Sequence, residues 1–248
     1  MFEPRLALAS LSGRSDAAWA RAVEDHVGAA FLGGIALCEP SRVAARALVE
    51  RDREEFLPPD PVAFVDRQLD ALADASLLAG FNVRSTALDP IREVAAVCAA
   101  HDAVVEINAH CRQAEMCAVG CGETLLRDPD RLAAHVRAAA ETGATVSVKV
   151  RAEVPGVDLA ETARRIEAAG ADTIHVDAMD TPQAIANVAT ASELFVVANN
   201  GVRDAATVET YLSLGADAVS VGRASDRPAV LERVRRAVAA WVEREAIA

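Results

Sequence analysis

Lysine is almost absent from this chain. Lys149 is the only lysine among 248 residues, and arginine supplies all the other members of the 25 basic side chains. Because the 37 acidic residues outnumber the basic ones, the formal net charge is −12. This negative charge argues against a protein that binds nucleic acid through a broad basic face.

Long apolar runs and a leader sequence are also missing. A membrane-spanning helix requires about 18 or more consecutive apolar residues without charged side chains. The sequence contains no such stretch. The first residues, MFEPRLALASLSGR, lack the order of basic and then apolar residues that marks a signal peptide. We therefore expect a cytoplasmic protein that has no membrane partner.

Cysteine is scarce and odd in number. Five cysteines in a chain of this length do not indicate a disulfide framework. Cys111, Cys117 and Cys121 have the spacing C-x5-C-x3-C, which is not typical of a zinc or iron–sulfur site. The sequence therefore predicts no metal site.

Apolar residues are abundant, at 52% of the chain, and suffice for a large core. Short β-branched or apolar runs alternate with longer amphipathic segments, the pattern of repeated strand–helix units. The expected strands are Arg5–Leu11, Ala30–Leu37, Leu78–Arg84, Ala103–Ala109, Thr145–Arg151, Thr173–Ala178, Leu194–Ala198 and Ala218–Val221. Eight units in about 250 residues predict one domain, a (β/α)8 TIM barrel over residues 1–248. A doubly wound open sheet is the alternative, but no G-x-G-x-x-G turn follows the first strand.

One charged, proline-rich stretch interrupts this alternation after the second expected strand. It runs from Arg51 to Pro61 and reads RDREEFLPPDP. Its composition favours a solvated loop, and a lid over the active site is the alternative.

Polar residues gather where the later strands end, which is where the reactive groups of a barrel lie. We therefore expect a polar pocket at the carboxyl ends of the strands. Its candidate residues are Asn108, His110, Cys111 and Arg112 after the fourth strand, Lys149 and Arg151 at the fifth, His175 and Asp177 at the sixth, Asn199, Asn200 and Gly201 at the seventh, and Gly222 and Arg223 at the eighth.

Lys149 is the strongest of these candidates. Arginine cannot replace lysine where a compact charge must approach a ring closely or where a nitrogen must lose its proton. A chain that uses arginine elsewhere has kept lysine at this strand end, which favours a functional role over a chance lysine at the barrel mouth.

The other candidates each have a structural alternative. Gly201 and the Gly222-Arg223 pair suit a phosphate bound by backbone amides, although glycine after a strand also serves simple turns. Cys111 suits a proton donor or nucleophile, or else a small buried apolar residue. His175 either faces the pocket or is hydrogen-bonded inside the barrel.

Several ordered motifs resemble those of one enzyme family. ALASLSGRSDAAWAR is similar to P-M-A-G-x-T-D-x-x-F-R, INAHC to N-x-G-C-P, and SVKVR to K-x-R. IHVDA stands where the family has H-G-R, and VVANNGV with AVSVGRA resembles its N-G-D and G-R ends. The chain thus resembles the tRNA-dihydrouridine synthases and their flavin-dependent barrel relatives, the dihydroorotate and dihydropyrimidine dehydrogenases. It looks closest to short archaeal relatives of the synthases.

This resemblance implies FMN at the barrel mouth, Lys149 at the flavin pyrimidine and Cys111 as general acid, with His175 as a further catalytic or flavin contact. The implied cofactor-binding residues are Ala9, Ser10, Asn82, Arg84, Lys149, His175, Asn199, Asn200, Gly201, Gly222 and Arg223. The implied substrate-binding residues are Asn108, Arg112, Arg151 and Asp177.

The chain also departs from the family pattern. Arg112 replaces the proline after the cysteine, and His110 replaces the glycine before it. Asp177-Ala178 takes the place of the arginine in H-G-R, and Asn82 or Arg84 takes the place of a glutamine that faces the flavin. Only one expected helix, over residues 228–246, follows the last strand, so the C-terminal helical domain of the synthases is not expected.

These observations predict an FMN-dependent oxidoreductase that reduces or oxidises a C=C bond of a uracil-like ring. The ring belongs to tRNA or, as in the dihydroorotate and dihydropyrimidine dehydrogenases, to a free small molecule. The net charge and the missing helical domain support the flavin chemistry better than the tRNA substrate. A reduced nicotinamide cofactor or a protein is the expected electron donor, and no oligomeric state is predicted. Other classes are a Schiff-base aldolase-type barrel, with Lys149 as the amine, and a non-catalytic FMN-binding protein.

Overall fold

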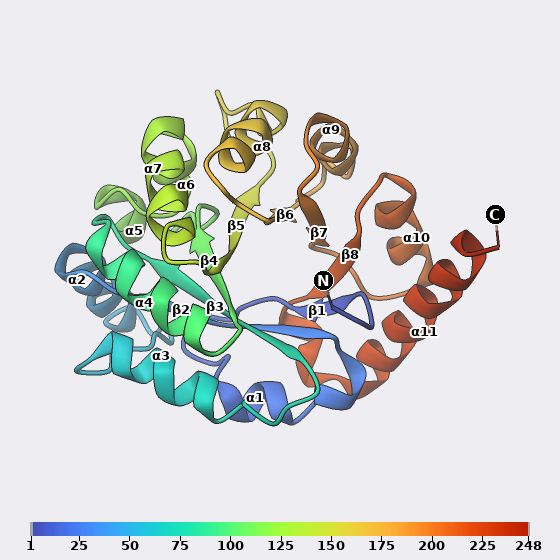
Figure 1. Cartoon of the computed structure of the whole chain (residues 1–248), viewed down its shortest axis with the longest axis horizontal. Helices are drawn as coiled ribbons and strands as arrows, with labels where there is room; N and C mark the ends of the chain where they lie inside the picture. Colours follow the sequence, from blue (N-terminus) through green and yellow to red (C-terminus); the bar gives the residue numbers. More distant parts are fainter. Residues whose placement is uncertain (1, 248) are drawn as a thin grey trace.

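The computed structural model describes residues 2–247 and is a closed barrel of parallel strands in the order β1 to β8, surrounded by helices (Figure 1). The strands are β1 (Leu6–Leu8), β2 (Ala29–Ala36), β3 (Leu78–Arg84), β4 (Val104–Asn108), β5 (Thr145–Arg151), β6 (Thr173–Asp177), β7 (Phe195–Asn199) and β8 (Ala218–Val221). The α-helices are α1 (Ala17–Arg21), α2 (Glu39–Val49), α3 (Pro61–Asp70), α4 (Asp89–Ala100), α5 (Ala114–Ala118), α6 (Glu123–Leu126), α7 (Pro129–Ala140), α8 (Leu159–Ala168), α9 (Gln183–Ala191), α10 (Ala205–Ser213) and α11 (Pro228–Glu245). Two 3-10 helices, η1 (Glu24–His26) and η2 (Arg223–Asp226), complete the chain.

The predicted TIM barrel is confirmed, and the open-sheet alternative is wrong. Strand β1 pairs with β8 in parallel, with Leu6 opposite Val219, and this pairing closes the sheet. Strand β1 is shorter than expected because the chain turns after Leu8 toward the barrel mouth. That turn is held by Ser15, whose Oγ accepts a hydrogen bond from the Leu11 amide at 2.8 Å.

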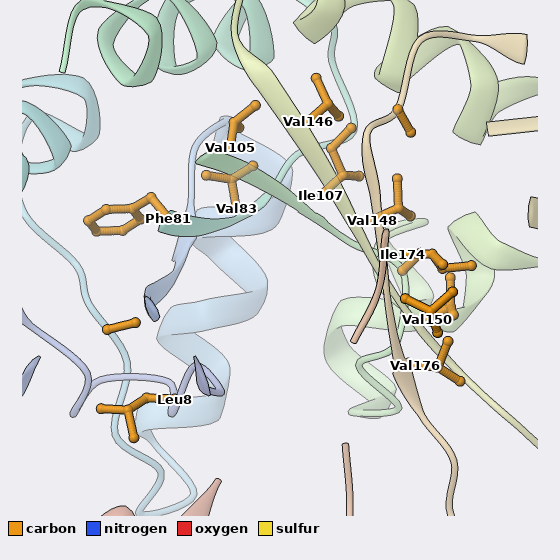
Figure 2. Close-up of a cluster of buried hydrophobic side chains, with 14 of the residues drawn as sticks. Leu8, Phe81, Val83, Val105, Ile107, Val146, Val148, Val150, Ile174 and Val176 are labelled. Atoms are coloured by element: carbon orange, nitrogen blue, oxygen red, sulfur yellow. The ribbon is translucent and has the colours of Figure 1, made fainter. Parts of the chain in front are cut away.

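The outer face of the barrel explains the β-branched runs of the sequence. Alternate residues of each strand point outward and pack against the helices, as Figure 2 shows for Val105, Ile107, Val148 and Ile174. Burying each of these side chains stabilises the fold by about 1.5–3 kcal/mol relative to exposure. The remaining alternate positions face the barrel axis and are therefore free to carry other chemistry.

The inside of the barrel is layered. The layer at the amino ends of the strands is apolar and consists of Phe2, Ala7, Ala29, Phe31, Val104, Val197 and Ala218. Above it lies a buried polar layer formed by Asn82, Glu106, Ser147, His175 and Ser220. The two layers touch where the Phe31 ring lies 5.2 Å from the His175 ring, measured between centroids. The polar side therefore faces the carboxyl ends of the strands, where a site is expected.

No helix within residues 2–247 combines the length and the apolar character needed to cross a membrane.

Candidate functional site

One cavity of about 930 Å³ opens at the carboxyl ends of the strands. Most of the residues selected from the sequence line it together, although they come from six different strand ends or following loops. Those residues are Ala9, Ser10, Asn108, Cys111, Arg112, Lys149, Arg151, Asp177, Asn199, Asn200, Gly201, Gly222 and Arg223. The convergence follows from barrel closure, because all parallel strands end on the same face.

Asn82, Arg84 and His175 do not line this cavity. All three are buried, with at most 1% of each residue exposed. The His175 ring lies between Glu106 Oε2, at 2.7 Å from Nδ1, and Ser220 Oγ, at 2.8 Å from Nε2. Of the two alternatives for His175, the structure favours a histidine that is hydrogen-bonded inside the barrel. These side chains support the cavity from beneath.

Glu106 is the residue that sequence reasoning missed. Its carboxylate accepts hydrogen bonds from Asn82 Nδ2 at 2.7 Å, from His175 Nδ1 at 2.7 Å and from Ser147 Oγ at 3.3 Å. Burial alone raises the pKa of Glu106, but the interaction with His175, the charge of Lys149 and the other hydrogen bonds lower it overall. Glu106 is therefore a buried anion. One feature of the sequence could have identified Glu106: it lies two residues before Asn108 and therefore on the same face of β4.

Lys149 lies above this anion and is only 1% exposed. Burial lowers the pKa of its ammonium, while the nearby carboxylates of Glu106 and Asp177 oppose that shift. Its ammonium makes no hydrogen bond with any residue of the described chain, although the side chain forms part of the cavity wall. A buried cation in this position is suited to a bound anionic or strongly polar group.

His175 completes the buried network as a neutral imidazole. Burial and the charge of Lys149 lower the pKa of His175 and outweigh the opposite effect of Glu106. The Nδ1–H group then donates to Glu106, and Nε2 accepts a hydrogen bond from the Ser220 hydroxyl. This arrangement fixes the orientation of Glu106 relative to Lys149.

The loop after β4 holds Cys111 against the cavity. Asn108 Oδ1 accepts hydrogen bonds from the backbone N–H of Cys111 at 3.1 Å and of His110 at 3.3 Å. The Cys111 carbonyl in turn accepts from the Glu123 amide at 2.9 Å. Residues 108–111 therefore form a fixed turn that places Cys111 in the cavity wall, where it also packs against the apolar cluster of Met116 and Cys121. Among residues 2–247, no group of three His, Cys, Asp or Glu side chains is placed to hold a metal ion.

The opposite side of the cavity offers unused backbone donors. The N–H groups of Gly222, Arg223 and Ala224 donate to no other residue in the described range, and all three residues line the cavity. Nearby, Asn200 and Gly201 have φ angles of 88° and 69°, which turn the chain sharply after β7. The Asn200 carbonyl is fixed by the Tyr211 hydroxyl at 2.8 Å. Converging amides beside an arginine favour a bound phosphate.

The segment 51–61 is a loop whose residues 51–54 are exposed, as expected, but it also forms part of the cavity wall. Residues 52–55 line the cavity. Glu55 forms an ion pair of 2.8 Å with Arg84, and their side chains are only 3% and 1% exposed. Arg84 also donates to the Ser12 hydroxyl at 2.7 Å, which ties the segment to the loop after β1.

Gly13 allows these two loops to approach closely. Its φ is +73°, and a Cβ placed there would lie 2.3 Å from the backbone carbon of Glu54. Gly13→Ala is expected to add overlap worth about 1–3 kcal/mol to a left-handed backbone penalty of about 1–2 kcal/mol. Gly143 is the matched control, because its φ is +84° but nothing lies within 4 Å of its Cβ position. Equilibrium unfolding in urea measures both losses, and equal losses would contradict the close packing.

Comparisons with known proteins agree with this architecture. The model of a family described as dihydrouridine synthase matches residues 83–246. Uncharacterized protein MJ0144 of Methanocaldococcus jannaschii is 24% identical over 151 residues, which are 60% of this chain and 58% of that protein. The matched region thus spans less than two thirds of that relative's length.

Solved structures are similar in fold. FabK from Thermotoga maritima has a TM-score of 0.59 at 17% identity, over 89% of this chain and 58% of that chain. A chain of the tryptophan synthase complex from Pyrococcus furiosus has a TM-score of 0.60 at 13% identity, over 97% of this chain and 100% of that chain. At these identities the similarity concerns the fold alone.

Proposed function

Because this chain belongs to the dihydrouridine synthase family, we propose that it is an FMN-dependent oxidoreductase that reduces or oxidises a C=C bond of a uracil-like ring. One observation carries the proposal. A buried ammonium on Lys149, the Cys111 thiol and the unused amides beside Arg223 line the same cavity. These are the groups needed to hold a flavin, to hold its phosphate and to deliver a proton.

The residues present fit FMN. The cavity volume of about 930 Å³ is within the usual range of small-molecule sites. Arg223 and the amides of residues 222–224 would hold the phosphate, and Lys149 would face the pyrimidine edge of the flavin ring. The backbone of Ala9 and Ser10 supplies a wall on which the ring can rest. When bound, FMN supplies the hydride chemistry.

The protein side chains then have separate tasks. The Lys149 ammonium stabilises negative charge at the flavin edge, in a buried setting where this stabilisation is strong. Asn108 and Arg151 orient the substrate carbonyls, and Arg151 is itself held by Glu123 at 3.0 Å. Cys111 gives its Sγ proton to the ring carbon next to the one that receives the hydride. In the reverse direction the same sulfur accepts the proton.

The remaining predicted residues act around this centre. Arg112 and Asp177 contribute charged side chains to the cavity wall where substrate enters. Asn82 and His175 act as positioning residues, because they reach the cavity only through Glu106 and Asn108. Arg84 acts likewise, because it holds the 51–61 segment in place through Glu55.

The test of FMN binding uses the purified protein. After reconstitution with FMN and removal of free flavin, the protein is expected to show flavin absorbance. Arg223→Gln is expected to raise the Kd for FMN at least about tenfold, because a charge-assisted hydrogen bond is lost. Arg92→Gln is the control, since Arg92 pairs with Asp89 and Glu141 on the outer helices. Protein that stays colourless after reconstitution with FMN would contradict the proposal.

The substrate is either uridine in tRNA or a free ring, as in a dihydroorotate or dihydropyrimidine dehydrogenase. The net charge of −12 favours the free ring. Loss of dihydrouridine from the tRNA of a strain that lacks the gene would support the tRNA substrate. Turnover of free pyrimidines with unchanged tRNA would support the small molecule. Turnover assays that supply either a reduced nicotinamide cofactor or a donor protein identify the electron donor.

The lowered pKa of Lys149 also suits a Schiff-base amine, which makes an aldolase-type activity the second candidate. Borohydride treatment with a carbonyl substrate would then attach that substrate to Lys149. The proposed flavoenzyme predicts no such adduct.

A further inference from the structure

His110 is a cavity residue that the proposed function leaves without a task. It stands on the wall directly before Cys111, at the position where the N-x-G-C-P motif has glycine. Its Nδ1 is shielded from solvent and has no hydrogen-bond partner among residues 2–247. Its Nε2 also makes no hydrogen bond with a described residue but is not shielded in this way. The ring therefore presents Nε2 to the cavity.

The charges around His110 keep its imidazole neutral. Burial lowers the pKa of His110 well below its usual value, and the positive charges of Lys149, Arg84 and Arg151 lower it further. A neutral ring in this position cannot act as a general acid at neutral pH, but it retains one N–H group for hydrogen bonding.

The position of that N–H group follows from the shielded nitrogen. A buried N–H without an acceptor is rarer and more costly than a buried lone pair without a donor. The proton therefore belongs on Nε2, with the lone pair on the shielded Nδ1. In this tautomer His110 offers one uncharged hydrogen-bond donor to whatever occupies the cavity beside Cys111.

We propose that His110 is a catalytic residue that donates a hydrogen bond from Nε2 to a carbonyl oxygen of the substrate. This inference rests on the proposed function. The carbonyl is the one conjugated with the reacting C=C bond. A free uracil-like ring has such a carbonyl at its 4-position.

The chemistry of the reduction requires a donor at this oxygen. Bound reduced FMN would supply a hydride, and with it two electrons, to the β-carbon of the substrate. The C=C bond opens, and the negative charge moves to the conjugated oxygen as an enolate. The His110 N–H stabilises that charge, and the Cys111 Sγ–H proton then goes to the α-carbon. Cys111 is left as a thiolate that regains its proton from solvent, so protons and electrons balance.

The backbone turn makes these two roles compatible. Asn108 Oδ1 holds the amides of both His110 and Cys111, at 3.3 and 3.1 Å, so the two residues are fixed by the same side chain. The backbone positions from which the two donors extend are therefore fixed relative to each other. This suits a substrate in which those two atoms belong to one planar group.

Ligand binding by the FMN-loaded protein tests the proposal without turnover. The probes are uracil, pyrimidin-4-one and pyrimidin-2-one, of which the last lacks the 4-carbonyl, and the readout is the change in the flavin absorption spectrum. The wild-type protein is expected to bind pyrimidin-4-one about tenfold more tightly than pyrimidin-2-one, as one hydrogen bond provides. His110→Phe keeps the ring but removes the donor, and it is expected to erase this preference.

Two further variants complete the design. His110→Gln retains an N–H donor and is expected to keep part of the preference. His101→Gln is the control, because His101 lies after α4 and contacts Asp66 away from the cavity. If His110→Phe binds flavin and still prefers pyrimidin-4-one to pyrimidin-2-one, the role of His110 is overturned while the proposed function stands. If the wild-type protein does not bind FMN, the proposed function fails and this inference fails with it.

NMR of the imidazole resonances gives a second readout. His110 is expected not to titrate between about pH 5 and 8, the range in which an ordinary histidine changes charge. A titration near the usual histidine value would show that His110 is charged near neutrality and would overturn the neutral donor. This measurement is independent of flavin and of substrate.

Discussion

Lys149→Met is expected to lower kcat by about 10²–10³-fold in the FMN-loaded protein. Methionine keeps the length and apolar stem of the side chain but removes the charge at the cavity. In the structure this ammonium has no hydrogen-bond partner among the described residues, and its nearest counter-charges, Glu106 and Asp177, lie around it. The cavity would then lack the cation that stabilises the negative charge of the reduced flavin.

Lys149→Arg separates charge from geometry. Arginine keeps a positive charge, but its planar fork is larger than an ammonium and cannot make the same close approach to a ring edge. We expect Lys149→Arg to restore little of the lost rate. Anaerobic stopped-flow measurement of substrate-dependent flavin oxidation gives the rates, with the flavin absorbance reporting cofactor occupancy. Retention of flavin reduction and substrate turnover by Lys149→Met would refute the assigned role.

Glu106→Gln is expected to lower the free energy of unfolding by about 3–5 kcal/mol at neutral pH. The substitution leaves the Lys149 ammonium buried without its principal counter-charge. It also replaces a group that only accepts hydrogen bonds with an amide, although Asn82 and His175 both donate to this position. One of these two donors then loses its acceptor.

The loss in Glu106→Gln depends on pH in a defined direction. In the wild type the folded-state pKa of Glu106 is lowered, so its contribution is complete above the unfolded value and is lost as pH falls through the folded value. In the variant the pKa of Lys149 falls further, because Glu106 no longer opposes the effect of burial. The folded variant then releases the lysine proton more easily than the unfolded chain does. Its stability is therefore expected to recover as pH rises.

Urea unfolding at neutral and alkaline pH measures this recovery. Glu161→Gln is the control, because Glu161 pairs with Arg164 and Arg165 on the solvent side of α8. That variant is expected to change stability little at either pH. A loss in Glu106→Gln that is the same at both pH values would show that Lys149 is not charged against Glu106.

The barrel was predictable from the sequence because its outer face obeys a simple rule. Each strand must bury alternate residues against helices, and this produces the β-branched runs that the alternation pattern detects. The lining of the cavity was predictable for a related reason, since residues at the strand ends converge once the barrel closes. Lys149, Gly201 and Gly222 are placed by topology alone, without knowledge of any side-chain contact.

The depth at which each inward-facing side chain lies along the barrel axis was not predictable in the same way. Lys149 and His175 lie opposite each other in the register of β5 and β6, yet only Lys149 lines the cavity. The lysine side chain is long enough to reach the next level, whereas the imidazole stays in the polar layer. Glu106 belongs to that same buried layer. A prediction based only on the residues at the strand ends therefore does not include it.

The buried ion pair of the 51–61 segment escaped prediction because it depends on a distant partner. Nothing in its local composition indicates that Glu55 meets Arg84, which is 29 residues away in the sequence. A charged, proline-rich stretch looks the same whether its carboxylates face water or a buried arginine. Only the contact between Glu55 and Arg84 in the folded protein distinguishes a fully solvated loop from one that forms part of the cavity wall.

The apolar layer at the amino ends of the strands decides from which side water can approach the polar layer. Phe2, Phe31 and Val104 fill that end, and Glu106 and His175 above them are fully buried. Water therefore approaches these groups from the side of the cavity. A ligand that fills the cavity would displace that water from the Lys149 ammonium and leave Glu106 and Asp177 as its counter-charges. The electrostatic interactions among these groups would then become stronger, because the local dielectric constant falls.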